Sequence, residues 1–186
     1  GKIARDLAEM YEPVADDAGV ELVVDTGSDL IVHGSRELVG QVVANLLENA
    51  LKYGMPSEDA VENTASEKLD ALAGCVAANG SLARDRSGIN RPKLHLSVHR
   101  SDGSIKIEVA DCGPGIPAAD RERVFDRFVR LEGSRSKPGS GLGLSLAAAV
   151  ARLHNGSLIL DDNHPGLRVT LALPASSSGP GKQPGI

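Results

Sequence analysis

Aromatic residues are scarce in this chain. Its 186 residues include two tyrosines, two phenylalanines and no tryptophan, although 41% of the residues are hydrophobic. We therefore expect one globular domain with a core of aliphatic side chains and alanine, and the scarcity argues against base-stacking surfaces. A net charge of −5, from 20 Lys and Arg against 25 Asp and Glu, argues against a chain that covers nucleic acid or an anionic membrane.

Cysteines and long apolar runs are also few. Cys75 and Cys112 cannot form a disulfide framework and lack CxxC spacing, so we expect reduced cysteines in a cytosolic setting. No apolar run approaches the roughly 18–20 residues that a membrane span needs. The first residues, GKIARDLAEM, do not resemble a signal peptide. These absences together predict a soluble fragment.

The hydropathy pattern predicts alternating helices and strands. Pro13 is expected to kink or divide the first helix, and Ser35 is a plausible cap for the second. The predicted helices are 2–18, 36–53, 118–128 and 142–154. The predicted strands are 20–25, 29–33, a hairpin of 94–100 and 105–110, 157–160 and 168–173.

Two segments differ in composition from the rest of the chain. Residues 54–92 are rich in Ala, Ser, Asn and Gly, and we expect an insertion with a polar helix over 57–73. A structureless loop of that length is uncommon inside a compact domain. The last residues, 175–186, have low complexity and predict a disordered tail.

The predicted helix 36–53 has two chemically different sides. Its apolar residues fall within an arc of about 100° and predict the core-facing side; they are Val39, Val43, Leu46, Leu47 and Ala50. Asn45, Asn49 and Lys52 fall within about 60° of one another on another side. Amide oxygens suit Mg²⁺, and a lysine ammonium neutralises phosphate. Taken alone, this side is better interpreted as a solvated polar face.

Two glycine-rich segments follow later in the chain. Asp111 begins DCGPGIP directly after a predicted strand, where glycines allow close approach to a flat ligand. A carboxylate at that point can accept a hydrogen bond from an exocyclic amine such as that of adenine, although an ordinary Gly-Pro turn is the alternative. GSGLGL, residues 139–144, opens the last helix, whose free N–H groups form an anion site. It is neither a Walker A loop nor a dinucleotide-binding fingerprint.

The segment between the two glycine-rich stretches is basic. Residues 121–137 carry five arginines and a lysine, which predicts a lid over a polyphosphate. Phe125 and Phe128, spaced i, i+3, are expected to anchor that lid to the core.

The order of these motifs resembles that of sensor histidine kinases. NLLENALKY, DCGPGIP, RVFDRFVR and GSGLGL resemble the N, G1, F and G2 boxes of that family, which belongs to the Bergerat-type ATPases. The resemblance covers residues 1–174 except 54–92. It implies an α/β two-layer sandwich, with a mixed sheet of about five strands covered on one face by three helices. It also implies an ATP-binding catalytic domain over 19–174, with 1–18 as the end of a connecting helix from a missing dimerisation domain.

The resemblance also implies roles for individual residues toward ATP and Mg²⁺. Asn49 resembles the Mg²⁺ ligand with Asn45 beside it, and Asp111 the partner of the adenine amine. The implied catalytic residues are Asn45, Glu48, Lys52 and Arg130. The implied nucleotide-binding residues are Asn45, Asn49, Lys52, Tyr53, Asp111, Gly113, Gly115, Ile116, Gly139, Gly141, Leu142, Gly143 and Leu144.

Asn45 distinguishes among branches of this superfamily. Gyrase, chaperone and mismatch-repair ATPases and the anti-sigma serine kinases carry a glutamate there, and Glu48 is the only carboxylate nearby. The missing base favours transfer to an external nucleophile over hydrolysis. None of the five histidines has the context of the family's phosphorylated histidine, so we expect the acceptor on the dimerisation domain of the same parent protein.

The resemblance further implies the setting of the chain. We expect a bacterial, cytoplasmic fragment that is monomeric by itself, contacts neither nucleic acid nor membrane, and serves a downstream response regulator. An inner-membrane anchor in the parent protein is compatible with this setting. Two alternatives stay open: a serine kinase or ATPase of the same superfamily, and a nucleotide-binding or docking module without catalysis.

Overall fold

The computed structural model describes residues 1–28, 30–55, 91–131 and 140–176. Five strands form one mixed sheet in the order β1-β2-β3-β5-β4. They are β1 Glu21–Thr26, β2 Lys93–Ser101, β3 Ser104–Ala110, β4 Ser157–Asp162 and β5 Leu167–Pro174. β1 and β2 are parallel, and the other neighbouring pairs are antiparallel.

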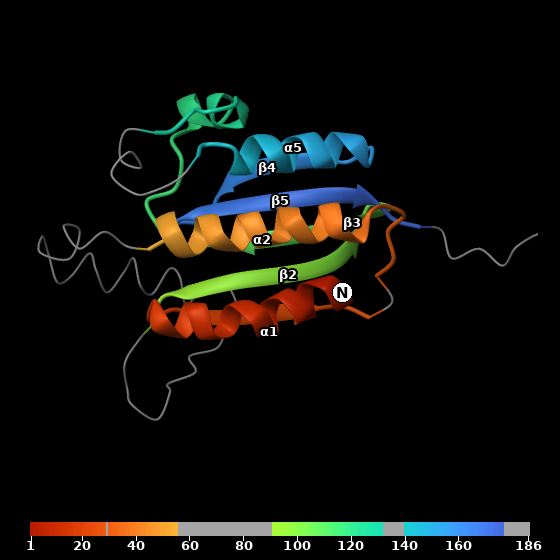
Figure 1. The fold of residues 1–186 in the computed structure, drawn as a ribbon, viewed down its shortest axis with the longest axis horizontal. Coiled ribbons are helices and arrows are strands. Elements are labelled where there is room, and N and C mark those ends of the chain that lie inside the picture. The colour runs from red at the N-terminus through yellow and green to blue at the C-terminus, as the bar shows by residue number, and fades with distance from the viewer. Residues whose placement is uncertain (29, 56–90, 132–139, 177–186) are drawn as a thin grey trace, which may run out of the picture.

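Three helices cover one face of this sheet (Figure 1). They are α1 Lys2–Asp17, α2 Arg36–Tyr53 and α5 Gly143–Leu153. α2 lies between the other two and contacts both. The predicted two-layer α/β fold is therefore confirmed.

α2 begins and ends where the sequence predicts. Ser35 caps its first turn, because the Leu38 N–H donates to Ser35 Oγ at 3.2 Å. Gly54 follows its last residue and donates its N–H to the Ala50 carbonyl at 2.7 Å. The predicted apolar side is buried, with Val43 and Leu47 fully inaccessible to solvent.

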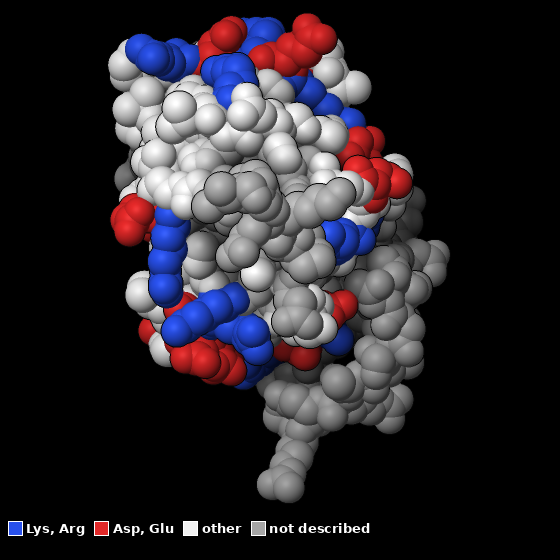
Figure 2. All heavy atoms as spheres, turned by 90° about the vertical axis from the view of Figure 1, so that its right-hand side faces the viewer, with Lys and Arg blue, Asp and Glu red and all other residues white. Residues whose placement is uncertain are grey.

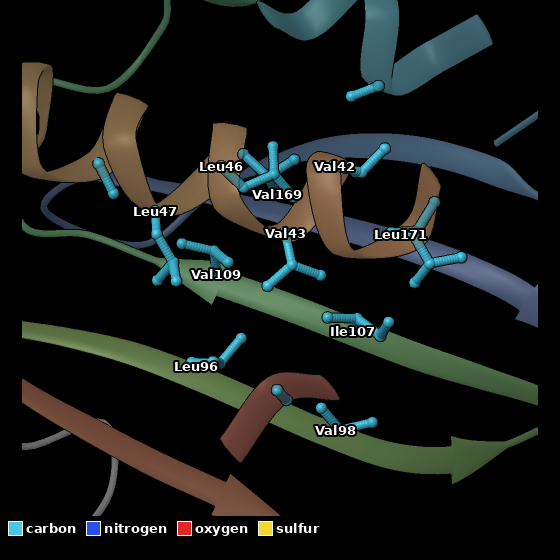
Figure 3. Packing of buried hydrophobic residues seen from close by; sticks show 14 of the residues in the cluster. Val42, Val43, Leu46, Leu47, Leu96, Val98, Ile107, Val109, Val169 and Leu171 are labelled. Atoms are coloured by element: carbon cyan, nitrogen blue, oxygen red, sulfur yellow. The ribbon is translucent and has the colours of Figure 1, made fainter. Parts of the chain in front are cut away.

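The core between α2 and the sheet is aliphatic (Figure 3). Side chains of α2 lie over two rows that cross three neighbouring strands. One row is Leu96, Val109 and Val169, and the other is Val98, Ile107 and Leu171. The scarcity of aromatic residues thus reflects a layer of branched side chains, which fit closely between a helix and a pleated sheet.

Two local predictions are wrong, and a third is wrong in part. α1 is one helix through Pro13, so Pro13 does not divide it. Residues 30–33 form no strand but a single bridge from Val32 to Ala175, and Leu30 and Val32 pack against the core instead. The segment 118–128 forms two 3₁₀ turns, Ala118–Asp120 and Arg123–Phe125, because Asp126 takes an extended conformation that ends the second one.

Other predictions fall largely outside the described residues. The polar helix over 57–73 and nearly all of the insertion lie there, as do residues 177–186 of the predicted tail. The first tail residues are hydrogen-bonded: the Ala175 N–H donates to the Gly103 carbonyl, and the Ser176 N–H to the Ile31 carbonyl.

The surface of one end of the molecule carries charges of both signs. Figure 2 shows the end where α1 begins and where β2 turns into β3, with acidic and basic side chains toward its edges. The C-terminal ends of α2 and β3 and the start of α5 lie at the opposite end (Figure 1). In the described parts of the chain, no helix has the length and apolar character needed to cross a membrane.

Candidate functional site

The two asparagines of α2 lie against the first turn of α5. A Cβ atom at Gly143 would lie 3.1 Å from Asn49 Nδ2 and 3.6 Å from Asn45 Oδ1. Both asparagines are half-buried, and no side chain caps the start of α5. The uncapped N–H groups of that turn and two amide side chains therefore share one small region.

Asp111 lies at the other end of this region, beside the C-terminus of α2. A side chain at Gly54 would overlap Asp111, and a Cβ at Gly113 would lie 2.7 Å from the Tyr53 carbonyl oxygen. The segment after β3 therefore packs directly on the end of α2. Both glycines are needed because any side chain would push the two backbones apart.

Asp111 is 7% exposed, and its carboxyl group accepts hydrogen bonds from backbone N–H groups. Oδ1 accepts hydrogen bonds from the N–H of Gly113 at 2.9 Å and of Leu167 at 3.1 Å. Burial raises the pKa of Asp111, and these two hydrogen bonds oppose that rise. Within the described parts of the chain Oδ2 has no hydrogen-bond partner, so a ligand amine can donate to it.

Lys52 and Glu48, two further polar residues of α2, make contacts on different sides of the helix. Lys52 Nζ lies 5.4 Å from the centre of the Tyr53 ring, and both residues are half-buried at the end of the helix. Glu48 is exposed, and its Oε1 accepts a hydrogen bond from the Tyr11 hydroxyl of α1 at 2.7 Å. Partial burial and this hydrogen bond raise the pKa of Tyr11 to about 12. The structure thus joins Glu48 to α1, and its catalytic role stays a prediction.

Comparison with known proteins identifies the family. The sequence profile of the histidine kinase-, DNA gyrase B- and HSP90-like ATPases matches residues 34–177. The chain belongs to this ATPase family. ATP binding and phosphotransfer are the role of its histidine kinase members.

The similar proteins are sensor histidine kinases. SenX3, a sensor-like histidine kinase of Mycobacterium tuberculosis, is 33% identical over 176 residues, which are 93% of this chain and 35% of SenX3. The adaptive-response sensory kinase SasA of Crocosphaera subtropica is 28% identical over 162 residues, 86% of this chain and 34% of SasA. The chain thus spans about a third of the length of the curated relatives it matches.

Solved structures show the same fold. The mycobacterial sensor histidine kinase MprB superposes with a TM-score of 0.65 at 26% identity, covering 94% of this chain and 93% of that one. The catalytic domain of the histidine kinase ThkA superposes with a TM-score of 0.67 at 18% identity, covering 93% and 92%. The resemblance to the catalytic domain of sensor histidine kinases is confirmed.

The lid side of this ATPase domain is described in part. The Phe128 N–H donates to the Gly141 carbonyl at 3.1 Å, which brings the end of the F box to the second glycine-rich segment. Ile116, Arg130 and Leu144 are half-buried, whereas Leu142 is 37% exposed. Gly139 lies outside the described residues.

One expectation about the lid is wrong. Phe125 packs against the core as predicted, but Phe128 is 72% exposed. The i, i+3 spacing places two side chains on one side only within a helix. Here the second 3₁₀ turn ends at Phe125, and Phe128 has a φ of 65°.

The donor set of the site fits Mg²⁺ better than a metal held by many protein ligands. No group of three or more His, Cys, Asp or Glu residues able to hold a metal occurs in the described parts of the chain. The oxygen ligands available beside α5 are the amides of Asn45 and Asn49. Mg²⁺ takes few protein ligands and completes its shell with phosphate oxygens and water, so these residues fit it.

The cysteine expectation needs a correction. Cys112 is 5% exposed and is disulfide-bonded rather than reduced. Spacing along the sequence does not report which residues meet in the fold, and a single bond needs no framework of cysteines. Cys75 lies outside the described residues.

The sequence does not predict the residues outside the motifs that make hydrogen bonds to Glu48 and Asp111. Tyr11 comes from α1, Asn163 from the turn between β4 and β5, and Leu167 is the first residue of β5. No spacing pattern marks these residues, since their contacts arise from the order of strands in the sheet. The pairing of β5 with β3, rather than with β4 alone, would have been the signal.

Proposed function

We propose that this chain binds Mg-ATP and transfers its γ-phosphate to a histidine of a separate helical dimerisation domain in the same parent protein. A response regulator then takes the phosphoryl group. The proposal includes 19–174 as the catalytic domain, 1–18 as the end of a connecting helix, and a cytoplasmic location in a bacterium. The observation that supports this proposal is that the Asp111 carboxylate, after β3, packs beside the end of α2, while two amides of α2 lie against the start of α5.

The nucleotide is expected to lie along the C-terminal half of α2. Asn49 and Gly54 are five residues apart, which is about 7.5 Å along a helix axis. Asp111, beside Gly54, accepts a hydrogen bond from the exocyclic amine of adenine through Oδ2. Tyr53 lines the same end, together with Gly113, Gly115 and Ile116 of the segment after β3.

The phosphates are expected at the start of α5. The uncapped N–H groups of that turn attract anions, and Lys52 and Arg130 add positive charge. Gly141 and Gly143 of the glycine-rich segment, with Leu142 and Leu144, line this end. When bound, Mg²⁺ neutralises phosphate charge, and Asn49 with Asn45 would hold it.

The transfer step requires little covalent chemistry from this chain. A ring nitrogen of the acceptor histidine forms a bond to the γ-phosphorus, and the bond from that phosphorus to the β–γ bridging oxygen breaks. Its electron pair leaves on ADP. The nitrogen carries its own lone pair, so a chain with Asn45 in place of a glutamate serves this acceptor better than it serves water.

Nucleotide binding tests the site assignment. We expect Asp111→Ala and Asn49→Asp each to lower the affinity for ADP in the presence of Mg²⁺ at least tenfold, measured by titration calorimetry. Asp111→Ala removes the acceptor for the amine, and Asn49→Asp changes the charge beside the phosphates. Asp102→Asn, in the β2–β3 turn at the opposite end of the molecule, is the control and should bind as the wild type does. Unchanged affinity in both site variants would contradict the assignment.

A further inference from the structure

The turn between β4 and β5, together with the first residue of β5, makes hydrogen bonds to both the main chain and the side chain of Asp111. Asn163 Nδ2 donates to the Asp111 carbonyl oxygen at 2.8 Å, and the Asp111 N–H donates to the Leu167 carbonyl at 2.9 Å. The Leu167 N–H donates in return to Asp111 Oδ1 at 3.1 Å. One hydrogen bond from the turn and two with the first residue of β5 therefore fix both the backbone and the carboxyl group of Asp111, the proposed acceptor for the amine.

Asn163 is itself oriented by its neighbours. Arg168 Nη2 donates to Asn163 Oδ1 at 3.0 Å, and the Asn163 N–H donates to the Gly166 carbonyl at 3.0 Å. Because guanidinium only donates, Arg168 assigns the oxygen of the amide, and Nδ2 must point to Asp111. The chain of contacts runs from Arg168 through Asn163 to Asp111.

Arg121 fixes the other end of the same segment. Its Nε donates to the Ile116 carbonyl at 3.1 Å, and its Nη2 pairs with Asp162 at the end of β4. This pairing lowers the pKa of Asp162. The turn after β4 thus contacts Asp111 directly, and the end of β4 is linked to Ile116 through Arg121; Asp111 and Ile116 border the expected base.

We propose that Asn163 and Arg121 are positioning residues that set the base specificity of the nucleotide site, by fixing Asp111 and Ile116 relative to each other. This inference rests on the proposed function. Adenine presents an amine donor where guanine presents a carbonyl acceptor. A carboxylate held in one place accepts from the first and repels the second, whereas a carboxylate that can move away discriminates less.

The test compares two nucleotides that differ in this group. The affinities of the 186-residue chain for ADP and GDP are measured by titration calorimetry for the wild type, Asn163→Leu and Arg121→Gln. Leucine has the branched shape of asparagine but no donor, so the Asp111 carbonyl loses its partner. We expect Asn163→Leu to lower the affinity for ADP about tenfold and the ADP-to-GDP affinity ratio by a similar factor. Arg121→Gln should change the ratio in the same direction.

The controls separate positioning from general stability. Arg36→Gln removes an arginine at the start of α2, far from the expected base, which pairs with Asp6 of α1, and should leave both affinities unchanged. If circular dichroism shows that Asn163→Leu does not fold, Arg168→Gln is used in its place. The Arg168→Gln variant removes the guanidinium group that orients the Asn163 amide. We expect it to lower the ratio as well.

An ADP-to-GDP affinity ratio that stays unchanged in folded variants would overturn the inference while the proposed function stands. If both affinities fall by the same factor, the ratio is also unchanged, and these residues have a structural role only. A wild-type chain that binds no ADP would instead overturn the proposed function, and the inference with it.

Discussion

At the scale of single residues, the Asp111 carboxyl group opposes stability and supports recognition. Burial raises its pKa above the usual 3.8. A carboxyl group whose pKa is higher in the folded than in the unfolded protein destabilises the folded state wherever the group is ionised in both states, which is at pH values above both pKa values. The cost is therefore present at neutral pH, and it disappears as the pH falls below the usual value.

We therefore expect Asp111→Asn to melt at the same temperature as the wild type or higher at pH 7, while its ADP affinity falls at least tenfold. The asparagine oxygen still accepts from Gly113 and Leu167, but no buried charge remains. The wild type should gain stability relative to the variant as the pH falls through the raised pKa. Thermal melts followed by circular dichroism from pH 7 to pH 3 measure this, and a variant clearly less stable than the wild type at pH 7 would contradict it.

Single residues also show how far the sequence leads. Asn45, Asn49 and Gly143 were predicted together from motif order, and the structure brings them into contact. Asn163 lies 52 positions from Asp111 and contacts it only because β5 pairs with β3. Local spacing carries no information on that register, so this support for the site was not predictable.

At the scale of elements, two side-chain hydrogen bonds join α1 to α2 within the described residues. Near the start of α2, Arg36 donates to Asp6, and in its C-terminal half Glu48 accepts from α1. The Tyr11 hydroxyl donates to Glu48 Oε1 at 2.7 Å, on the side of α2 away from α5. If α1 continues from a dimerisation domain, as proposed, this bond fixes the connecting helix to the helix that carries Asn45 and Asn49.

We expect Tyr11→Phe to lower the free energy of unfolding by about 0.5 kcal/mol at pH 7, the low end for such bonds because the pair is exposed. The pKa of Tyr11 is raised from 10.0 to about 12, so its contribution is complete below pH 10 and is lost as the pH rises toward 12. Urea unfolding at pH 7 and above pH 10 measures both effects. Glu48→Gln, which keeps an acceptor oxygen, should cost less, and equal stability of Tyr11→Phe and the wild type at pH 7 would contradict the account.

A hydrophobic periodicity that extends over several helical turns predicts the bounds of an element well. α2 matches its predicted bounds, because a cap and an apolar stripe agree over five turns. Two predictions from short patterns are wrong. The residues predicted as a strand near 30–32 pack against the core without pairing as a strand, and the helix predicted over 118–128 is replaced by two 3₁₀ turns. Tertiary packing decides such segments, and a single sequence does not report it.

At the scale of the whole molecule, the described residues divide into a scaffold and a working end. Aliphatic rows between α2 and the sheet hold the helix in place (Figure 3). The C-terminal ends of α2 and β3 and the start of α5 meet at one end of the sandwich (Figure 1). The family assignment and this meeting point support a catalytic domain that acts on a histidine outside itself.

Phosphotransfer tests this central claim most directly. The chain is incubated with its parent's helical dimerisation domain and with ATP labelled at the γ-phosphate. We predict label on a histidine of the helical domain, as an acid-labile and base-stable phosphoramidate, and none with Asn49→Asp. Steady release of labelled phosphate by the chain alone, with no label on the helical domain, would contradict the account.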